Sequence, residues 1–355
     1  MSEYEIVELV VPSSADAADA TDFVEAVAIQ SLVEVEGYGT DELWQSAADV
    51  LPFFQDPGNP RRLFGVRRDG RLIARAVFDW QTSDDTSAFA KVEVLPAYRR
   101  QGIGTALADY LEDLIRQSGR VKIISWAVSK PGDGETLDSP TGFGSVPRNN
   151  EDVVFLLGRG FTLEQVERAS RLALPIDADE LRERVEAAIN RSGPDYAVHY
   201  WSVATPERWL EQMAMLHTRM STDAPSAGLE EPEDVWTVER VVENEANHAK
   251  AKIILTAAVE HVPTGTLAGY TTLAVPHETG RPVFQDDTLV IKDHRGHKLG
   301  MLLKVANLAH LEREHPGHPS VITWNAEENR FMLDVNEAVG FAPIGYEGAW
   351  KKLLD

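Results

Sequence analysis

Two segments of this chain repeat one pattern without a gap, and this repeat constrains the fold more than any other feature of the sequence. VEVLPAYRRQGIGTAL and TLVIKDHRGHKLGMLL align with Arg99 opposite Arg295 and with Gly104 opposite Gly300. Both pairs are 196 residues apart (295 − 99 and 300 − 104). Each segment runs from an extended apolar stretch through a glycine-containing turn into an amphipathic helical pattern. Similarity at one fixed offset indicates two copies of one structural unit.

The similarity continues downstream of each turn. A buried strand is predicted after each helix, in VKIISWAV and in SVITWN, and Trp126 corresponds to Trp324. Both copies end in a short helical stretch followed by Gly-Phe, at Gly160 and at Gly340. Upstream, RRLFGVRRDG and RLIARAVFDW form a predicted hairpin, with KIILTAAVEH and TLAGYTTLAV as counterparts.

We therefore expect an α/β fold, with mixed sheets, built from two tandem domains. The first domain spans residues 1–175 and the second spans residues 196–355. Residues 176–195 form a helical linker, because DADELRERVEAAINRSG is amphipathic and a Gly-Pro pair ends it. The first copy carries an insertion over residues 130–150, rich in Gly, Pro and Ser, which we interpret as a loop and a candidate lid.

The composition excludes several classes of function. The net charge of −23, from 57 acidic and 34 basic residues, repels nucleic acid and anionic membranes and favours the approach of a cationic substrate. The sequence has no apolar run near the roughly 20 residues that cross a bilayer, and MSEYEIVELV does not resemble a secretory signal. The absence of cysteine removes thiolate metal sites and an acyl-cysteine intermediate. We expect a cytoplasmic protein without a metal site.

The repeated turn has the properties of an anion site. A strand that passes through a turn into a helix exposes unpaired backbone N–H groups at the helix start, where the helix dipole also favours negative charge. Gly102 and Gly104 let phosphate oxygens approach the main chain, and Arg99 and Arg100 add positive charge. The spacing differs from the dinucleotide-binding G-x-G-x-x-G motif. A pyrophosphate-containing ligand is predicted here.

These residues carry a family resemblance. VEVLPAYRRQGIGTAL resembles the cofactor-binding motif of the GNAT superfamily of N-acetyltransferases, and the two Gly-Phe closures resemble that family's next motif. The resemblance covers both halves, and the tandem arrangement is similar in architecture to that of mycothiol synthase. It implies a sheet of six or seven strands whose fourth and fifth strands splay apart, with acetyl-CoA as co-substrate in the opening. It also implies direct acetyl transfer to the amine of a small molecule.

The resemblance further implies which residues hold acetyl-CoA. The backbone of Val94 and Leu95 would pair with the pantetheine arm, as would that of Val290 and Ile291 in the second half. The two turns would hold the pyrophosphate. Their residues are Arg99, Arg100, Gln101, Gly102, Ile103, Gly104 and Thr105 in the first half and Arg295, Gly296, His297, Lys298, Leu299, Gly300 and Met301 in the second.

The sequence departs from the family pattern at two kinds of position. Lys298 stands where the first turn has Gly102, and we expect it to have an ordinary negative φ, with its ammonium near the phosphates. The alternative is a decayed copy that is retained for packing. Many relatives also have a tyrosine four residues before the Gly-Phe glycine, placed to protonate the leaving thiolate. Leu156 and Asn336 occupy these positions, and neither is a general acid.

The incoming ammonium must lose a proton before it can attack, and a carboxylate usually accepts that proton. The candidates are Asp286 and Asp287 in the second half, which match the acids that some relatives have before the strand valine, and Glu93 in the first half. Glu93 lies in an otherwise apolar strand, so the alternative for it is an exposed edge or an ion pair with Lys91 or an arginine. The alternative for the two aspartates is a polar loop before the strand.

Two asparagines near the end of the chain complete the candidate residues. By resemblance, Asn325 and Asn329 would bond the cofactor, although Asn325 could equally be a helix N-cap with Glu328 as its capping partner. Five histidines between residues 294 and 318 lack a metal-ligand pattern, and we interpret them as a surface cluster.

The sequence thus predicts an acetyl-CoA-dependent N-acetyltransferase that acts on a small amine through a ternary complex. The first half has the more complete turn and the second has the better placed acids, which slightly favours chemistry in the second half. One half would then be catalytically degenerate. The alternative is a non-catalytic acyl-CoA-binding or protein-interaction module, which the missing tyrosines favour. The sequence leaves the oligomeric state open.

Overall fold

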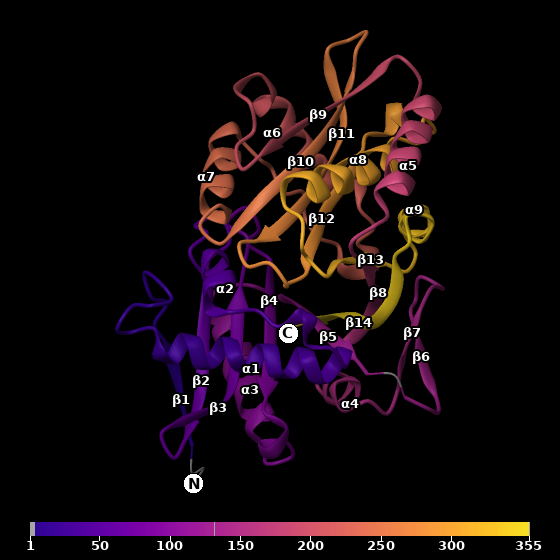
Figure 1. The fold of residues 1–355 in the computed structure, drawn as a ribbon. Coiled ribbons are helices and arrows are strands. Elements are labelled where there is room, and N and C mark those ends of the chain that lie inside the picture. The colour runs from indigo at the N-terminus through magenta and orange to yellow at the C-terminus, as the bar shows by residue number, and fades with distance from the viewer. Residues whose placement is uncertain (1–3, 131, 355) are drawn as a thin grey trace. The chain divides into compact units, whose positions relative to one another are not determined.

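The structure, a computed structural model, describes residues 4–130 and 132–354 (Figure 1). The chain divides into two compact units. Unit 1 comprises Met1–Glu167, Ser226–Glu230 and Gly345–Asp355, and unit 2 comprises Arg168–Pro225 and Glu231–Ile344. These units differ from the division expected from the sequence, because unit 1 includes two segments from the second half of the chain and unit 2 includes the expected linker.

Unit 1 is a mixed sheet with helices on both faces. The order of its strands is β1-β2-β3-β4-β5-β14-β8. Its helices and 3₁₀ turns are α1 (Thr21–Tyr38), η1 (Asp41–Leu43), α2 (Ala47–Phe54), η2 (Pro96–Tyr98), α3 (Ile103–Gln117), α4 (Glu151–Gly158) and η4 (Ala227–Leu229). Its strands are β1 (Glu5–Leu9), β2 (Arg61–Arg68), β3 (Arg71–Asp79), β4 (Ser87–Val94), β5 (Lys122–Ser129), and parts of β8 (Thr162–Ala173) and β14 (Ala342–Leu353).

The period-2 alternation of the strands divides the core of unit 1 into two layers. On β2, Leu63 packs against Phe23 of α1 on one face of the sheet, and the next residue, Phe64, packs with Leu107 of α3 on the other. The predicted hairpin is confirmed, since Asp69 and Gly70 join β2 and β3 with φ of 52° and 78°. The insertion forms the small hairpin of β6 (Thr136–Asp138) and β7 (Ser145–Pro147).

The C-terminal strand completes unit 1. Strand β14 pairs antiparallel with β5, with Glu347 opposite Val128. The segment around η4 is bound nearby, since Leu229 is buried with Ile124 of β5 and Ala349 of β14. The ammonium of Lys122 donates to the carbonyls of Leu229 and Glu230 at 3.0 and 2.7 Å.

Unit 2 repeats the plan, with the strand order β8-β13-β12-β11-β10-β9. Its helices and 3₁₀ turns are α5 (Ala178–Ser192), η3 (Glu207–Trp209), α6 (Leu210–Asp223), α7 (Val238–His248), η5 (Lys292–His294), α8 (Leu299–Glu314) and α9 (Arg330–Val339). Its remaining strands are β9 (Tyr196–Ser202), β10 (Lys252–His261), β11 (Thr266–Pro276), β12 (Val283–Val290) and β13 (Ser320–Ala326).

Helix α8 is buried on nearly all sides, because it packs both on the sheet and against α5, the helix predicted as a linker. Leu303 and Leu308 of α8 share a core with Leu181 and Ala188 of α5. The opposite face of the sheet packs against α6. The prediction of a surface histidine cluster is wrong in part, since His310 and His318 are buried.

Candidate functional site

In each unit, two adjacent parallel strands pair only at one end and then separate. In unit 1, β4 and β5 pair over three positions, the last being Phe89 opposite Ile124. In unit 2, β12 and β13 pair over two positions, the last being Phe284 opposite Ile322. An aromatic pair marks both points of separation: Phe89 stacks on Trp126 at 5.5 Å between ring centroids, and Phe284 stacks on Trp324 at 6.0 Å. Both units therefore have the predicted splayed strands.

The turn of unit 1 exposes the start of α3. Gly102 is the N-cap with φ of 84°, a left-handed conformation that glycine adopts without a steric cost. The next backbone N–H groups lie in the first turn of the helix, where they lack intrahelical partners. The side chain of Arg100 is exposed beside them. This end of α3 can therefore hold an anion.

The first arginine of each turn has a different role from the one expected. The Arg99 guanidinium donates to the Val94 carbonyl at 3.0 Å and forms an ion pair with Glu36 of α1 at 2.6 Å. In unit 2, Arg295 donates to the Val290 carbonyl at 3.1 Å and pairs with Asp223 of α6 at 2.9 Å. Each arginine thus ties its turn to a helix on the other face of the sheet, and a carboxylate offsets its charge.

Part of the backbone expected to hold pantetheine already has partners. The N–H of Leu95 donates to the carbonyl of Ile73, and the N–H of Ile291 donates to the carbonyl of Ala268. The carbonyls that precede these amides accept from Arg99 and Arg295. In unit 1, the edge of β4 that no strand covers, and that is available to a ligand, lies between the end of its pairing with β5 and Val94.

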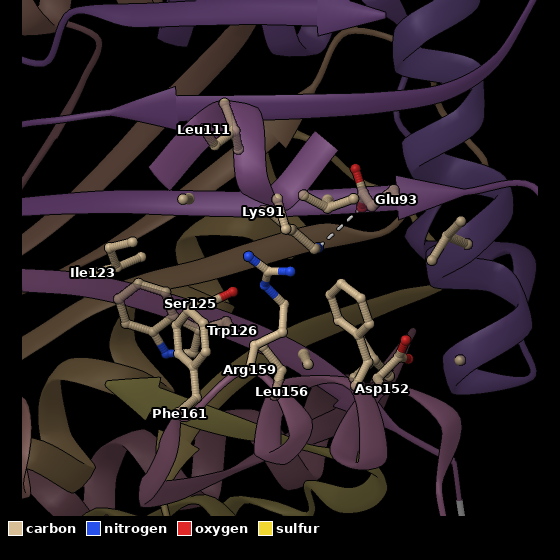
Figure 2. Close-up of a pocket in the computed structure, with 18 of the residues that line it drawn as sticks. Lys91, Glu93, Leu111, Ile123, Ser125, Trp126, Asp152, Leu156, Arg159 and Phe161 are labelled. Atoms are coloured by element: carbon tan, nitrogen blue, oxygen red, sulfur yellow. Dashed lines mark ion pairs between the residues drawn. The ribbon is translucent and has the colours of Figure 1, made fainter. Parts of the chain in front are cut away.

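A cavity occupies the opening between β4 and β5 of unit 1 (Figure 2). The space in it that a water molecule can enter amounts to about 100 Å³, and the cavity is partly open to solvent. A second hollow adjoins it, shares Val92, Glu93 and Phe155 with it, and extends to Gly102 and Gly104 at the start of α3. Together they form one path from the turn into the sheet.

This cavity passes through the sheet. On one side it is lined by α1, including Glu34 and Glu36, and on the other by α3, including Ala108 and Leu111. Figure 2 shows Arg159 reaching from the end of α4 toward the strands. The side chains of β5, together with the residue just before β8, add an apolar wall of Trp126, Ala127, Val128 and Phe161.

Glu93 forms a buried ion network instead of an open base. Its carboxylate lies 2.6 Å from Nε of Arg75 and 3.2 Å from Nζ of Lys91, and its side chain is 2% exposed. Burial opposes the charge, but Arg75 and Lys91 outweigh it and lower the pKa of Glu93. The alternative reading of Glu93, an ion pair with Lys91 or an arginine, is confirmed. A carboxylate with a lowered pKa is a weak proton acceptor.

Glu347 is the acid that sequence reasoning missed. It lies on β14 opposite Val128, whose side chain packs against Gly37 of α1, so Glu347 is on the α1 face. Burial is the main cause that raises the pKa of Glu347, and Glu34 adds to it while Lys91 opposes it. Only the pairing of β14 with β5 brings this residue to the first half, and no local pattern indicates that pairing.

The turn of unit 2 has the same shape as that of unit 1. Lys298 is the N-cap of α8 with φ of 59°, so the expected negative φ is wrong. The left-handed region costs a residue with a Cβ about 1 to 2 kcal/mol, which explains why glycine is the better residue at this position. The lysine side chain is exposed.

Asp286 and Asp287 lie within β12 and not in a loop before it. Asp287 accepts a hydrogen bond from the buried Tyr270 hydroxyl at 2.8 Å, and His217 lies 3.1 Å from that hydroxyl. Desolvation by the surrounding protein, opposed by Lys252, raises the pKa of Asp286 to about 7. Its side chain is nevertheless exposed, and access to water limits this rise.

The two predicted cofactor asparagines are engaged within unit 2. Asn329 is the N-cap of α9 and accepts from the Met332 N–H at 3.3 Å, so the alternative of Asn325 as the cap is wrong. Asn325 instead accepts a hydrogen bond from the Asn336 amide at 2.6 Å. That bond joins the end of β13 to α9.

The residues of unit 1 fit an acyl-CoA. The exposed helix start and Arg100 suit its phosphates, the opening between the strands suits a narrow flexible arm, and the cavity gives space where the arm would end. Within residues 4–130 and 132–354, every helix is too short or too polar to span a bilayer. In the same part of the chain, no group of three or more His, Cys, Asp or Glu side chains could hold a metal ion.

Splayed strands next to an anion-binding turn are the features of an acyl-CoA N-acyltransferase fold, and the comparisons agree. Residues 26–135 match the model of the acetyltransferase (GNAT) family. This match lies in unit 1. No curated protein matches the sequence. Unit 1 thus contains the region that matches the GNAT family model, and the chain as a whole has the tandem GNAT fold.

Solved structures show that fold over nearly the whole chain. A tandem GNAT protein from the clavulanic acid biosynthesis pathway is 22% identical, with a TM-score of 0.74 over 99% of this chain and 98% of that one. A GCN5-related N-acetyltransferase from Sphaerobacter thermophilus is 13% identical, with a TM-score of 0.62 over 99% and 96%. Saccharomyces cerevisiae N-myristoyltransferase with bound myristoyl-CoA is 12% identical, with a TM-score of 0.58 over 99% and 79%.

Proposed function

We propose that this chain is an acetyl-CoA-dependent N-acetyltransferase that transfers acetyl directly to the amine of a small molecule, and that the reaction takes place in unit 1. The observation that carries this proposal is the cavity that passes through the sheet from the α3 side to the α1 side. A donor that enters from one face and an acceptor that enters from the other can then meet between β4 and β5. This location departs from the slight preference of the sequence for the second half.

The donor side is the path from the turn into the opening. When bound, acetyl-CoA supplies the acyl group as a thioester. The first N–H groups of α3 and the side chain of Arg100 hold the phosphates. Phe155 and Leu156 of α4 and Ala108 of α3 line the path and keep water from the thioester. The chain has no cysteine, so transfer through an acyl-cysteine is excluded.

The acceptor side is the part of the cavity under α1, and its polar lining consists of paired acidic and basic side chains. Glu34, Glu36 and Glu93 all line it. Lys91, Arg99 and Lys130 line the same part and pair with these acids, so the local charge is close to balanced. The net charge of −23 adds a field that attracts an ammonium ion. We therefore expect a compact amine as the acceptor, attracted by the field of the whole protein.

Glu347 is not itself in the cavity lining, but it interacts with Glu34 and Lys91, which are, and it is our candidate for the group that accepts the proton of the ammonium. Its raised pKa brings it closer to neutral pH than an ordinary carboxylate, which favours proton transfer from an ammonium. Glu93 and Lys91 would act as positioning residues, which set the charge around Glu347. Asp286 and Asp287 remain the corresponding candidates for any chemistry in unit 2.

A thiol-release assay tests the proposal. The protein is incubated with acetyl-CoA and a panel of amines that includes polyamines, amino sugars and aminoglycosides, and free CoA is measured with a thiol reagent. We expect release that depends on one class of amine, with the acetylated amine seen by mass spectrometry. Binding of acetyl-CoA without release on any amine would instead support the non-catalytic acyl-CoA-binding module, which the apolar Leu156 at the general-acid position favours.

A further inference from the structure

Three positions that line the cavity of unit 1 carry larger or polar residues in unit 2. In unit 1 these positions are Ala108 of α3, Ala127 of β5 and Leu156 of α4, and all three line the opening between the strands. The repeat places their counterparts at Lys304 of α8, Asn325 of β13 and Asn336 of α9. Both units have the same point of strand separation, so the counterparts lie at the equivalent opening.

Lys304 extends into the space that the alanine leaves free. Its side chain has four more heavy atoms than alanine, and the residue is only 1% exposed. Its ammonium lies 5.8 Å from the ring centre of Phe341. Phe341 is the counterpart of Phe161, which lines the cavity of unit 1. The lysine therefore occupies the α8 side of the second opening.

The two asparagines close the opening from its other sides. Their hydrogen bond of 2.6 Å links β13 directly to α9. In unit 1 the same two elements present Ala127 and Leu156, which make no such bond and leave a path between them. A ligand arm between β13 and α9 would have to break this bond and leave the buried Asn336 amide without a partner, which is unfavourable.

We propose that Lys304, together with the Asn325–Asn336 bond, closes the second opening to acyl-CoA, so that each chain binds a single acyl-CoA, in unit 1. The three residues are specificity determinants that separate two otherwise similar clefts. The proposal deepens the proposed function and rests on it, since acyl-CoA is the ligand considered. The turn of unit 2 can keep its shape without binding phosphate. Its left-handed N-cap and the contacts of Arg295 with Val290 and Asp223 hold the backbone in place without a ligand.

Calorimetric titration with CoA tests the proposal on the full chain. We expect one site per chain in the natural protein. The triple variant Lys304→Ala, Asn325→Ala, Asn336→Leu gives unit 2 the lining of unit 1, and we expect it to bind two. The single variant Lys304→Met keeps the bulk of the side chain, and we expect it to bind one.

A second measurement does not depend on the triple variant. In hydrogen–deuterium exchange on the natural protein, CoA should slow exchange in residues 99–105 and leave residues 295–301 unchanged. Two sites in the natural protein, protection of both turns, or a folded triple variant that still binds one CoA would each overturn the proposal. If neither the natural protein nor the triple variant binds CoA, the proposed function is overturned, and this inference with it.

Discussion

The burial of Lys304 without an acidic partner gives a quantitative prediction for stability. Desolvation alone lowers the pKa of Lys304 from 10.5 to about 7 in the folded protein. At a pH well below 7 the amine is charged in both states, and the fall in pKa corresponds to a cost of about 5 kcal/mol to the folded state. Between pH 7 and 10.5 the unfolded chain holds a proton that the folded chain has released. Stability therefore rises with pH in this window, and the cost disappears above it.

Replacing Lys304 by methionine should remove this cost. We expect Lys304→Met to be more stable than the natural protein at pH 6, and its advantage should shrink by about 3 kcal/mol between pH 6 and pH 9.5. Urea unfolding at each pH measures the two free energies. Leu308→Met is the matched control, because Leu308 is equally buried on the same helix and has no charge. An advantage of Lys304→Met that does not change with pH, or a loss of stability at pH 6, would refute the reasoning.

Three further predictions concern unit 1. Glu93→Gln alone should cost about 3 to 5 kcal/mol in urea unfolding, since it leaves Arg75 as an unpaired buried charge. The double change Arg75→Tyr, Glu93→Leu installs the residues found at the equivalent positions of unit 2 and should recover most of that loss. Leu229→Ala should cost about 2 to 5 kcal/mol in the same assay, because it leaves a cavity beside β5. Glu347→Gln should lower kcat more than KM and remove the rise of kcat with pH through the raised pKa of Glu347; an unchanged pH profile would exclude it as the base.

Local patterns predict the parts of the fold that local interactions determine. The hairpin at Asp69, the turn and helix of each copy, and the helix that Gly193 ends all appear in the structure where the sequence places them. In each case a turn residue and an apolar period act over a few residues. A single strand-turn-helix pattern is weak evidence for a fold. Its recurrence at a fixed offset strengthened the prediction, because each copy supported the interpretation of the other.

Long-range pairing and burial are the parts that the sequence does not reveal. Glu347 reaches unit 1 through the pairing of β14 with β5, more than 200 residues apart in the chain. No local pattern indicates that Lys304, a charged residue, is buried at the second opening beside Phe341. The conformation of Lys298 follows from the shape of the turn and overrides the preference of the residue itself.

If unit 1 holds the donor and carries out the transfer, one substitution in each turn should have opposite effects on activity. Gly102→Glu and Gly300→Glu each place a carboxylate at the start of one helix, where it repels a pyrophosphate. With the best amine of the panel and saturating acetyl-CoA, we expect Gly102→Glu to abolish CoA release and Gly300→Glu to retain it. Full activity in Gly102→Glu together with loss of activity in Gly300→Glu would contradict the account.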